Sequence, residues 1–317
     1  MTTPLYLTES DVAALVTVGD AVAALEGAFA AWRDPATSNL PRQRAKLGEG
    51  FLNVMPAVYG RAGLFGLKTY FPGKAGMTYH VVLYSSVEQR MLAIIEAQLL
   101  GQLRTGAASG LATKLLARAN SRALGVIGAG RQARAQVLAV CAVRPITRIN
   151  VFARDAERRA AFARAIEAEA KVETRPAETA QACVAGADVV VTITNSREPV
   201  CRGTWLADGT HVNAAGANAA NRRELDAEAV LRAAVRATDD RRQAQEEAAE
   251  FRDLVAEGRL TWDDVVELGD IAGGTVQGRT SDAELTLFKS LGIALEDIAF
   301  AEIIYRRALE AGAGKRL

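Results

Sequence analysis

Small residues occupy the positions where a phosphate could approach the chain in the segment 128–133, which has the pattern Gly-x-Gly-x-x-Ala. Gly128 can adopt the backbone angles of a tight turn between a strand and a helix, and Gly130 lets a pyrophosphate come close to the backbone. Ala133 is small enough for the helix to pack on the strand, and the helix N-terminus offers unpaired N–H groups to phosphates. The pattern predicts a dinucleotide site, with a nucleotide-free turn as the alternative. The predicted cofactor-binding residues of this turn are Gly128, Ala129, Gly130, Arg131, Gln132 and Ala133.

The segments around this turn are typical of a nucleotide-binding unit. Leu124–Ile127 has the composition of a buried strand, Gln132–Ala142 that of a helix, and Arg148–Ala153 that of a second strand at βαβ spacing. Thr194 follows a further predicted strand, Val189–Ile193, and is also expected to contact the cofactor.

The end of the second strand indicates which cofactor is bound. Sites that prefer NAD usually place Asp or Glu there, bonded to the ribose 2′-hydroxyl, whereas this chain has Ala153 followed by Arg154. A guanidinium suits a 2′-phosphate and can stack on adenine. The sequence therefore favours NADP(H) over NAD(H). Two alternatives stay open: Asp155 could serve as the acidic group, and Arg154 could be an ordinary surface arginine.

Composition excludes several classes of protein. The 317 residues suggest about two domains, and a hydrophobic fraction of 50% with 24% charged residues is ordinary for a soluble globular protein. A net charge of +1 predicts neither nucleic acid nor an anionic membrane as a partner. The polar segment Met1–Asp11 lacks the pattern of a signal peptide, so we expect a cytoplasmic protein.

The few cysteines and histidines argue against a disulfide framework and a metal site. Cys141, Cys183 and Cys201 lie far apart and are expected to be buried thiols. His80 and His211 are the only histidines, which makes a hydrolase that depends on histidine, or a site with several histidine ligands, a poor expectation.

The periodicity of apolar residues divides the chain into two regions. A helical pattern over Glu9–Trp32 precedes four short strands of a mostly antiparallel sheet, predicted at 51–55, 64–70, 79–85 and 91–96, and Leu103–Leu116 is helical. From residue 123, strands and helices alternate as in a doubly wound parallel sheet. The predicted fold class is α/β, a Rossmann-type sheet (118–295) plus an α+β substrate and dimerisation domain (1–117 with 296–317).

Three later segments carry specific expectations. The charged segment Asp239–Glu257 is predicted to be helical with a solvated face, and Gly269–Gly274 is predicted to be a loop. Leu285–Leu309 is predicted to be an amphipathic helical region, broken near Gly292.

Several motifs together resemble one known family. The segments Arg104–Ala112 (RTGAASGLA), the Gly128 turn, Ser196–Val200 (SREPV) and Leu287–Asp297 (LFKSLGIALED) follow one another as in the ornithine cyclodeaminase/mu-crystallin family. The resemblance covers nearly the whole chain. It implies a Rossmann domain plus a dimerisation and substrate domain, a homodimer, an NAD(H) or NADP(H) cofactor, and small amino acids or cyclic imines as substrates.

The resemblance also implies roles for three basic residues. Arg42 and Arg104 match the arginines that hold the substrate carboxylate, and Lys68 matches the active-site lysine. The chemistry agrees, because paired guanidiniums bind a carboxylate through fork-like hydrogen bonds and a buried lysine can exchange protons near neutral pH. The alternatives are a surface arginine for Arg42, with Arg44 as its rival, a strand-edge lysine for Lys68, and a helix-start salt bridge for Arg104.

Two departures from the family distinguish between its activities. Ornithine cyclodeaminases have a Glu where this chain has Asn53, and an Asp where it has Asn218. An amide can orient a substrate but cannot accept a proton at neutral pH, and cyclodeamination needs a base near the substrate amines. Asn53 and Asn218 are therefore predicted to bind substrate in a reductase or dehydrogenase. The alternative is that another acid, Asp270 or Asp297, takes the role of base.

The sequence thus predicts an NAD(P)-dependent oxidoreductase, of the ketimine reductase or alanine dehydrogenase type, with Lys68 as its catalytic residue. We expect a small imino or amino acid as substrate, a homodimer, and no metal, nucleic acid or membrane. The alternatives are an ornithine cyclodeaminase, which forms proline and ammonia while recycling its NAD, and a non-catalytic protein that binds a ligand in the presence of NADPH.

Overall fold

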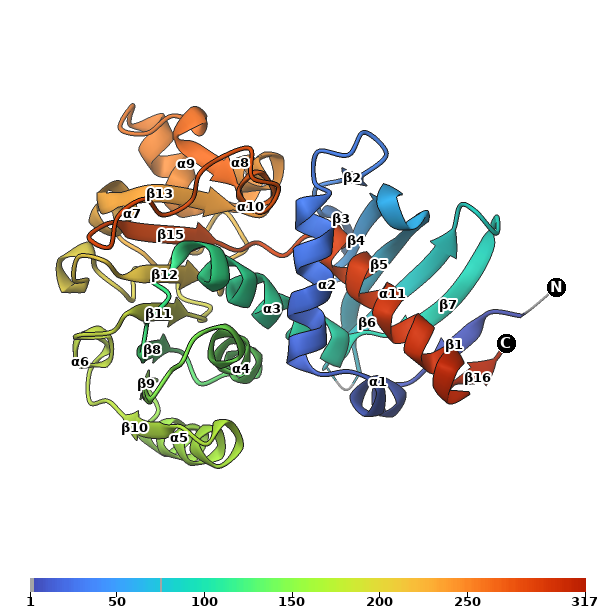
Figure 1. The fold of residues 1–317 in the computed structure, drawn as a ribbon, viewed down its shortest axis with the longest axis horizontal. Helices are drawn as coiled ribbons and strands as arrows, with labels where there is room; N and C mark the ends of the chain where they lie inside the picture. Colours follow the sequence, from blue (N-terminus) through green and yellow to red (C-terminus); the bar gives the residue numbers. More distant parts are fainter. Residues whose placement is uncertain (1–2, 75) are drawn as a thin grey trace. The chain divides into compact units, whose positions relative to one another are not determined.

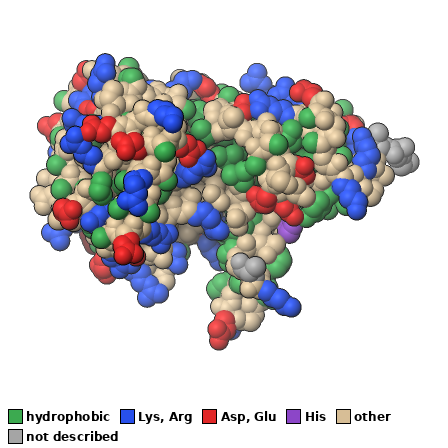
Figure 2. All heavy atoms as spheres, turned by 90° about the horizontal axis from the view of Figure 1, so that it is seen from below, with side chains coloured by type: hydrophobic (Ala, Val, Ile, Leu, Met, Phe, Trp, Pro, Cys, Tyr) green, Lys and Arg blue, Asp and Glu red, His purple; other side chains and the backbone are tan. Residues whose placement is uncertain are grey.

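A computed structural model describes residues 3–74 and 76–317, so the first two residues of the polar segment Met1–Asp11 lie outside the description. The chain forms two compact units: Met1–Arg104 with Ile293–Leu317, and Thr105–Gly292. The first boundary lies 13 residues before the predicted one at 117/118, and the second lies three residues before the predicted one at 295/296. Acidic and basic side chains are interspersed on the face drawn in Figure 2, in keeping with the net charge of +1.

The first unit is built on an eight-stranded sheet with the order β16-β1-β7-β6-β5-β4-β2, in which β3 also pairs with β4. All pairings are antiparallel except that of β1 with β7. The four strands predicted in this region are confirmed and extended. The strands are β1 (Leu5–Leu7), β2 (Ser38–Asn39), β3 (Gln43–Leu47), β4 (Gly50–Tyr59), β5 (Leu64–Gly73), β6 (Gly76–Ser85), β7 (Arg90–Glu96) and β16 (Lys315–Arg316).

Helix α11 (Ala294–Ala311) lies across one face of this sheet, and α2 (Val18–Ala30) packs beside α11 (Figure 1). Position 66 requires a glycine, because a Cβ there would lie 2.2 Å from the Val82 carbonyl oxygen on β6 and 2.8 Å from the Ile298 side chain on α11. Helix α1 (Glu9–Leu15) is separate from α2, since Thr17 caps a new helix by accepting a hydrogen bond from the Asp20 N–H. The single helical run predicted over Glu9–Trp32 is therefore wrong in this detail.

The second unit contains an eight-stranded sheet with the order β10-β9-β8-β11-β12-β15-β13-β14, and every pairing in it is parallel. The strand order reverses between β8 and β11, which is the place where open α/β sheets bind their ligands. The predicted fold class is confirmed. The strands are β8 (Ala123–Ile127), β9 (Arg148–Phe152), β10 (Glu173–Pro176), β11 (Val189–Thr192), β12 (His211–Ala214), β13 (Ala233–Thr238), β14 (Val265–Glu267) and β15 (Leu285–Lys289).

Helices cover the faces of this second sheet, with apolar cores between helices and strands (Figure 1). The helices are α4 (Ala133–Val143), α5 (Ala156–Ala170), α6 (Ala180–Val184), α7 (Ala227–Arg232), α8 (Arg241–Glu247), α9 (Ala249–Ala256) and α10 (Leu268–Ala272). Helix α3 (Gln98–Leu116) contains the boundary between the units at Arg104. No single helix in the described ranges is long and apolar enough to cross a membrane; α1 and α2 meet that criterion only when taken together across an 86° bend.

Two predicted elements of the second unit are wrong. The start of the predicted helical region Leu285–Leu309 is the strand β15, whose five residues are all buried between layers, so that alternation is absent and periodicity cannot separate strand from helix. Leu268–Ala272 forms the short helix α10, which overlaps the predicted loop at 269–274.

The charged segment Asp239–Glu257 does not present a simple solvated face. It folds into α8 and α9, and several of its polar side chains point inward, namely Asp239, Asp240, Gln243, Glu247 and Glu250, none more than 5% exposed. Asp239 shows why: its carboxylate accepts the N–H groups of Leu291 and Gly292, both at 2.7 Å, which bonds this segment to the chain that follows β15. A charge count cannot reveal such long-range partners.

Candidate functional site

The turn after β8 has the conformation that its glycines predict. Gly128 has a φ of +125°, and its N–H donates to the Phe152 carbonyl at 2.8 Å. A Cβ at Gly128 would lie 2.4 Å from the Ile193 carbonyl oxygen, so both the backbone angle and the space require glycine. Ala133 is fully buried at the start of α4, as predicted.

The middle of the turn is open, which fits a pyrophosphate. A Cβ at Gly130 would meet only one atom within 4 Å among the described residues, the Arg158 Nη2 at 3.7 Å. Arg158 donates from Nε to the Ala129 carbonyl at 3.0 Å, which holds its cation beside the turn. Arg131 is exposed, and Gln132 immediately precedes α4. Open backbone, a helix N-terminus and a cation form a fitting donor set for phosphate oxygens.

Arg158 is a functional candidate that the sequence analysis missed. It lies in the first turn of α5, and its position beside Ala129 depends on how α5 packs against the loop after β8. Asp155 caps α5 by accepting the Arg158 N–H at 2.9 Å, so its carboxylate already serves the helix. Arg154 is exposed at the end of β9 and makes no hydrogen bond or ion pair with any described residue.

Thr194 and Asn218 lie at the carboxyl ends of the next two strands. Thr194 follows β11 and Asn218 lies in the segment after β12; both are half-buried. The Thr194 hydroxyl donates to Glu224 Oε1 at 2.8 Å. Thr194 therefore belongs to the same edge of the sheet as the glycine turn, where nucleotides bind in this type of fold.

In the first unit, Lys68 forms a buried ionic cluster with three residues from other elements. Its Nζ donates to Asp297 Oδ1 at 2.9 Å, and Arg104 donates from Nε to the same oxygen at 2.9 Å. Arg104 Nη1 also donates to Glu296 Oε2 at 2.7 Å. Lys68 comes from β5, Arg104 from α3 and both acids from the first turn of α11, and all four side chains are buried.

The surroundings of Lys68 lower its pKa to about 8. Burial is the main cause, and the positive charges of Arg104 and Arg42 add to it, while Asp297 opposes the shift. For Arg104 burial also disfavours the charge, but Asp297 and Glu296 outweigh it and raise the pKa of the guanidinium. The ring of Tyr79 lies 5.8 Å from Lys68 Nζ. Lys68 can therefore give or take a proton near neutral pH.

The remaining predicted residues of this unit differ in how deeply they are buried. Arg42 is buried, with 4% of its surface exposed, whereas its rival Arg44 is exposed on β3. Asn53 is also buried, and its amide donates to the backbone carbonyls of Phe51 and Tyr70 at 3.2 and 3.3 Å. Of the two acids that could replace a missing carboxylate, Asp297 contacts Lys68 directly.

The three cysteines and His211 are at least partly buried, which indicates structural roles. Cys183 and Cys201 are buried, Cys141 is partly so, and burial raises the pKa of the Cys183 and Cys201 thiols to about 12. His211 lies between Thr286 and Asn213, and burial lowers its pKa to about 3. Within residues 3–74 and 76–317, no cluster of His, Cys, Asp or Glu could hold a metal ion.

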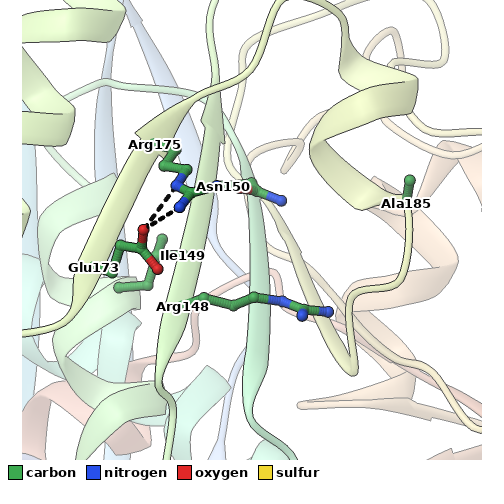
Figure 3. Close-up of a pocket in the computed structure, with 6 residues that line it drawn as sticks. All are labelled: Arg148, Ile149, Asn150, Glu173, Arg175 and Ala185. Atoms are coloured by element: carbon green, nitrogen blue, oxygen red, sulfur yellow. Dashed lines mark hydrogen bonds and ion pairs between the residues drawn. The ribbon is translucent and has the colours of Figure 1, made fainter.

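A cavity of about 230 Å³ lies elsewhere in the second unit, near the amino ends of β9 and β10 (Figure 3). Two of its lining cations are already engaged: Arg148 donates to the Gly186 carbonyl and Arg175 bonds to Glu173. Because nucleotides bind at the opposite, carboxyl ends of parallel strands, this cavity is not the candidate site. Its lining residues are Arg148, Ile149, Asn150, Glu173, Arg175 and Ala185.

Comparison with known proteins agrees with this geometry. The model of the ornithine cyclodeaminase/mu-crystallin family matches residues 2–312. An alanine dehydrogenase of Archaeoglobus fulgidus is 35% identical over 322 residues, which cover 99% of this chain and 98% of the relative.

Two solved structures are similar over almost their full length. One is the Thermococcus litoralis Delta(1)-pyrroline-2-carboxylate reductase in complex with NADH and L-proline, with a TM-score of 0.93, 31% identity, and coverage of 99% of this chain and 100% of the other. The other is an archaeal alanine dehydrogenase dimer with bound NAD, with a TM-score of 0.92, 32% identity, and coverage of 99% and 98%.

Proposed function

Because this chain belongs to the ornithine cyclodeaminase/mu-crystallin family, we propose that it is an NAD(P)-dependent oxidoreductase that interconverts a small imino acid and the corresponding amino acid. The observation that carries the proposal is the buried Lys68–Asp297–Arg104 cluster, which joins a proton-exchanging amine to charged groups that suit a zwitterionic substrate. The glycine turn in the second unit fits the cofactor that such chemistry requires.

The proposed mechanism assigns a separate task to each side chain. Arg42 and the remaining Nη2 of Arg104 bind the substrate carboxylate, and Asn53 orients the rest of the substrate. Lys68, with a pKa of about 8, gives a proton to the substrate nitrogen during reduction and takes one back during oxidation. The nicotinamide cofactor, when bound, supplies or accepts the hydride.

A survey of substrates tests this function. NADPH and NADH consumption is followed with cyclic imino acids, and with keto acids plus ammonia or methylamine, for the wild type and for Lys68→Ala. We expect turnover on at least one imine, and a loss of kcat of about 100- to 10,000-fold in Lys68→Ala. Turnover near the wild-type rate in Lys68→Ala would refute the role of the lysine.

We also propose that the enzyme prefers NADP(H) over NAD(H). Arg154 carries a guanidinium without a partner among the described residues, Arg158 holds a second one beside the turn, and Asp155 is used as a helix cap. Arg154→Ala should weaken NADPH binding about tenfold or more and leave NADH binding nearly unchanged. Arg164→Ala, at an exposed position on α5, is the matched control. Equal or tighter binding of NADH by the wild type would contradict the preference.

Cyclodeamination is the second candidate function. Asn53 and Asn218 stand where the family's cyclodeaminases have acids, but Asp297 supplies a carboxylate beside Lys68. The wild type is incubated with ornithine and NAD. Formation of proline and ammonia, without net change in nicotinamide absorbance, would establish this activity in place of net hydride transfer.

A further inference from the structure

Glu224 bonds together the two loops that follow β11 and β12. Its Oε1 accepts the Thr194 N–H at 2.6 Å and the Thr194 hydroxyl at 2.8 Å. Its Oε2 accepts the N–H groups of Gly216 at 2.6 Å and Ala217 at 3.2 Å. Glu224 has no exposed surface, and four donors on its two oxygens require an ionised acceptor.

The two loops are also in direct contact. A Cβ at Gly216 would lie 2.2 Å from both the N and the O of Thr194, so the backbones can approach only with glycine there. Glu224 is fixed in turn, because its own N–H donates to Glu250 Oε1 at 2.8 Å, and that oxygen lies 3.2 Å from Lys289 Nζ. This buried network gives Thr194 one defined position.

The network also determines which kind of hydrogen bond Thr194 can offer. A hydroxyl has one hydrogen and two lone pairs. The hydrogen is directed to Glu224, and the Ser196 N–H approaches the hydroxyl oxygen at 3.3 Å, which occupies one lone pair. One acceptor position remains, so Thr194 can bind a ligand only by accepting a hydrogen bond.

We propose that Glu224 positions Thr194 so that its hydroxyl oxygen accepts a hydrogen bond from the carboxamide NH₂ of the nicotinamide. The proposal rests on the proposed function. β11 and β12 lie beyond the point where the strand order reverses, on the side away from β9, whose end would face the adenosine half. The carboxamide is the part of the nicotinamide that carries N–H donors, and it matches the one acceptor that Thr194 has left.

The test compares two cofactors that differ only in this group. In the 3-acetylpyridine analogue of NADP⁺, a methyl group replaces the carboxamide NH₂. Dissociation constants for NADP⁺ and the analogue are measured by calorimetry for the wild type, Thr194→Val, Thr194→Ser and Glu224→Gln. The control is Thr192→Val on β11, since the buried Thr192 hydroxyl has no hydrogen-bond partner among the described residues.

We expect the wild type, Thr194→Ser and Thr192→Val to bind NADP⁺ about tenfold more tightly than the analogue. This ratio of dissociation constants corresponds to the contribution of one hydrogen bond. In Thr194→Val and Glu224→Gln this ratio should approach one, whereas a purely structural role would weaken both cofactors equally. A wild-type ratio retained in Thr194→Val would overturn the proposal. If Glu224→Gln does not fold, Thr194→Val decides whether Thr194 accepts the hydrogen bond, and failure of the wild type to bind both NADP⁺ and NAD⁺ would refute the proposed function instead.

Discussion

At the scale of single residues, the pKa of Lys68 determines the expected pH dependence. Burial together with the charges of Arg104 and Arg42 lowers this pKa to about 8, and Asp297 opposes the shift. Since imine reduction consumes the Lys68 proton, kcat/KM for reduction should be constant below pH 8 and fall about tenfold per unit above it. Amino acid oxidation should show the opposite trend. The measurement is initial rates in both directions from pH 6 to 10.

Asp297→Asn provides the companion experiment. Removing the negative charge that raises the pKa of Lys68 should move the fall in reduction rate to lower pH. A profile that stays unchanged in Asp297→Asn would show that another group controls the ionisation.

Arg104 is expected to matter for stability as much as for substrate binding. Arg104→Ala would leave the buried carboxylates of Glu296 and Asp297 without their common partner. Breaking a buried ion pair in this way costs about 3–5 kcal/mol. We expect urea denaturation to show this loss in the variant without substrate, and exposed Arg61→Ala to show almost none. A wild-type free energy of unfolding in Arg104→Ala would contradict the role of the ion pairs.

The sequence predicted which residues belong to the site better than it predicted the residues to which they bond. Lys68, Arg42 and Arg104 follow from the family resemblance, yet nothing in their spacing pairs them with α11, because Asp297 is separated from Lys68 by 229 residues. Arg158 and Glu224 were missed for the same reason: an arginine in a helix and a glutamate in a loop are common, and only tertiary contacts distinguish them.

At the scale of elements, the turn after β8 depends on Gly128. Alanine at this position would meet the Ile193 carbonyl oxygen at 2.4 Å and would have to adopt a φ of +125°. Gly128→Ala should abolish measurable cofactor binding and lower the melting temperature. Gly274→Ala is the control, since its φ is +74° but no atom of the described residues lies within 4 Å of the added Cβ; it should cost only about 1 kcal/mol. Tight NADPH binding by Gly128→Ala would disprove the assigned role of the turn.

The pairing of β12 with β15 involves His211, which bonds to Thr286 across the sheet at 3.0 Å. Its pKa of about 3 lies below that of an unfolded histidine, so the unfolded state binds more protons between these values. His211 should therefore contribute a loss of stability as the pH falls from about 6.5 to 3, of about 1.4 kcal/mol per pH unit. Free energies of unfolding at pH 7, 6, 5 and 4 test this, and in His211→Gln the dependence on pH should be weaker. An equally steep loss in the variant would exclude His211 as a cause.

Short apolar runs predicted even fully buried strands such as β8 and β11, and alternation of buried and exposed side chains predicted strands of the first sheet. β4 to β7 alternate in this way and were found, whereas β15 is buried along its whole length and was assigned to a helix. The segment Asp239–Glu257 was misjudged because its acids accept N–H groups and pair with Lys289 from distant parts of the chain.

At the scale of the whole molecule, the alternation of strands and helices after residue 123 is a local signal, so the Rossmann-type unit could be predicted. The return of the C-terminal segment 296–317 to the first domain was predicted, as the family resemblance implies, and α11 does pack on the N-terminal sheet (Figure 1). The sequence did not reveal that β1 pairs with β16 or that Asp297 bonds to Lys68. Such contacts span almost the full chain, and no window of sequence contains both partners.

The face of the first sheet that points away from α11 carries exposed apolar side chains. Val58, Phe65 and Tyr84 stand side by side in register on β4, β5 and β6, the last two with stacked rings 5.1 Å apart. Val58 and Phe65 are 39% and 38% exposed. Clustered exposed apolar groups mark interaction surfaces, so we propose that the expected homodimer joins two copies of the chain through this face.

If this face forms the interface, a charge placed in it should change the mass of the protein in solution without changing the fold of the chain. Phe65→Glu places a charge in the middle of the proposed interface on both copies, and each unpaired buried charge costs several kcal/mol, which weakens the dimer. We expect light scattering to give the mass of a dimer for the wild type and of a monomer for Phe65→Glu, with unchanged circular dichroism. Val87→Glu is the control, because Val87 is 81% exposed in the turn between β6 and β7. A dimer that survives Phe65→Glu would place the interface elsewhere, and a monomeric wild type would refute dimerisation altogether.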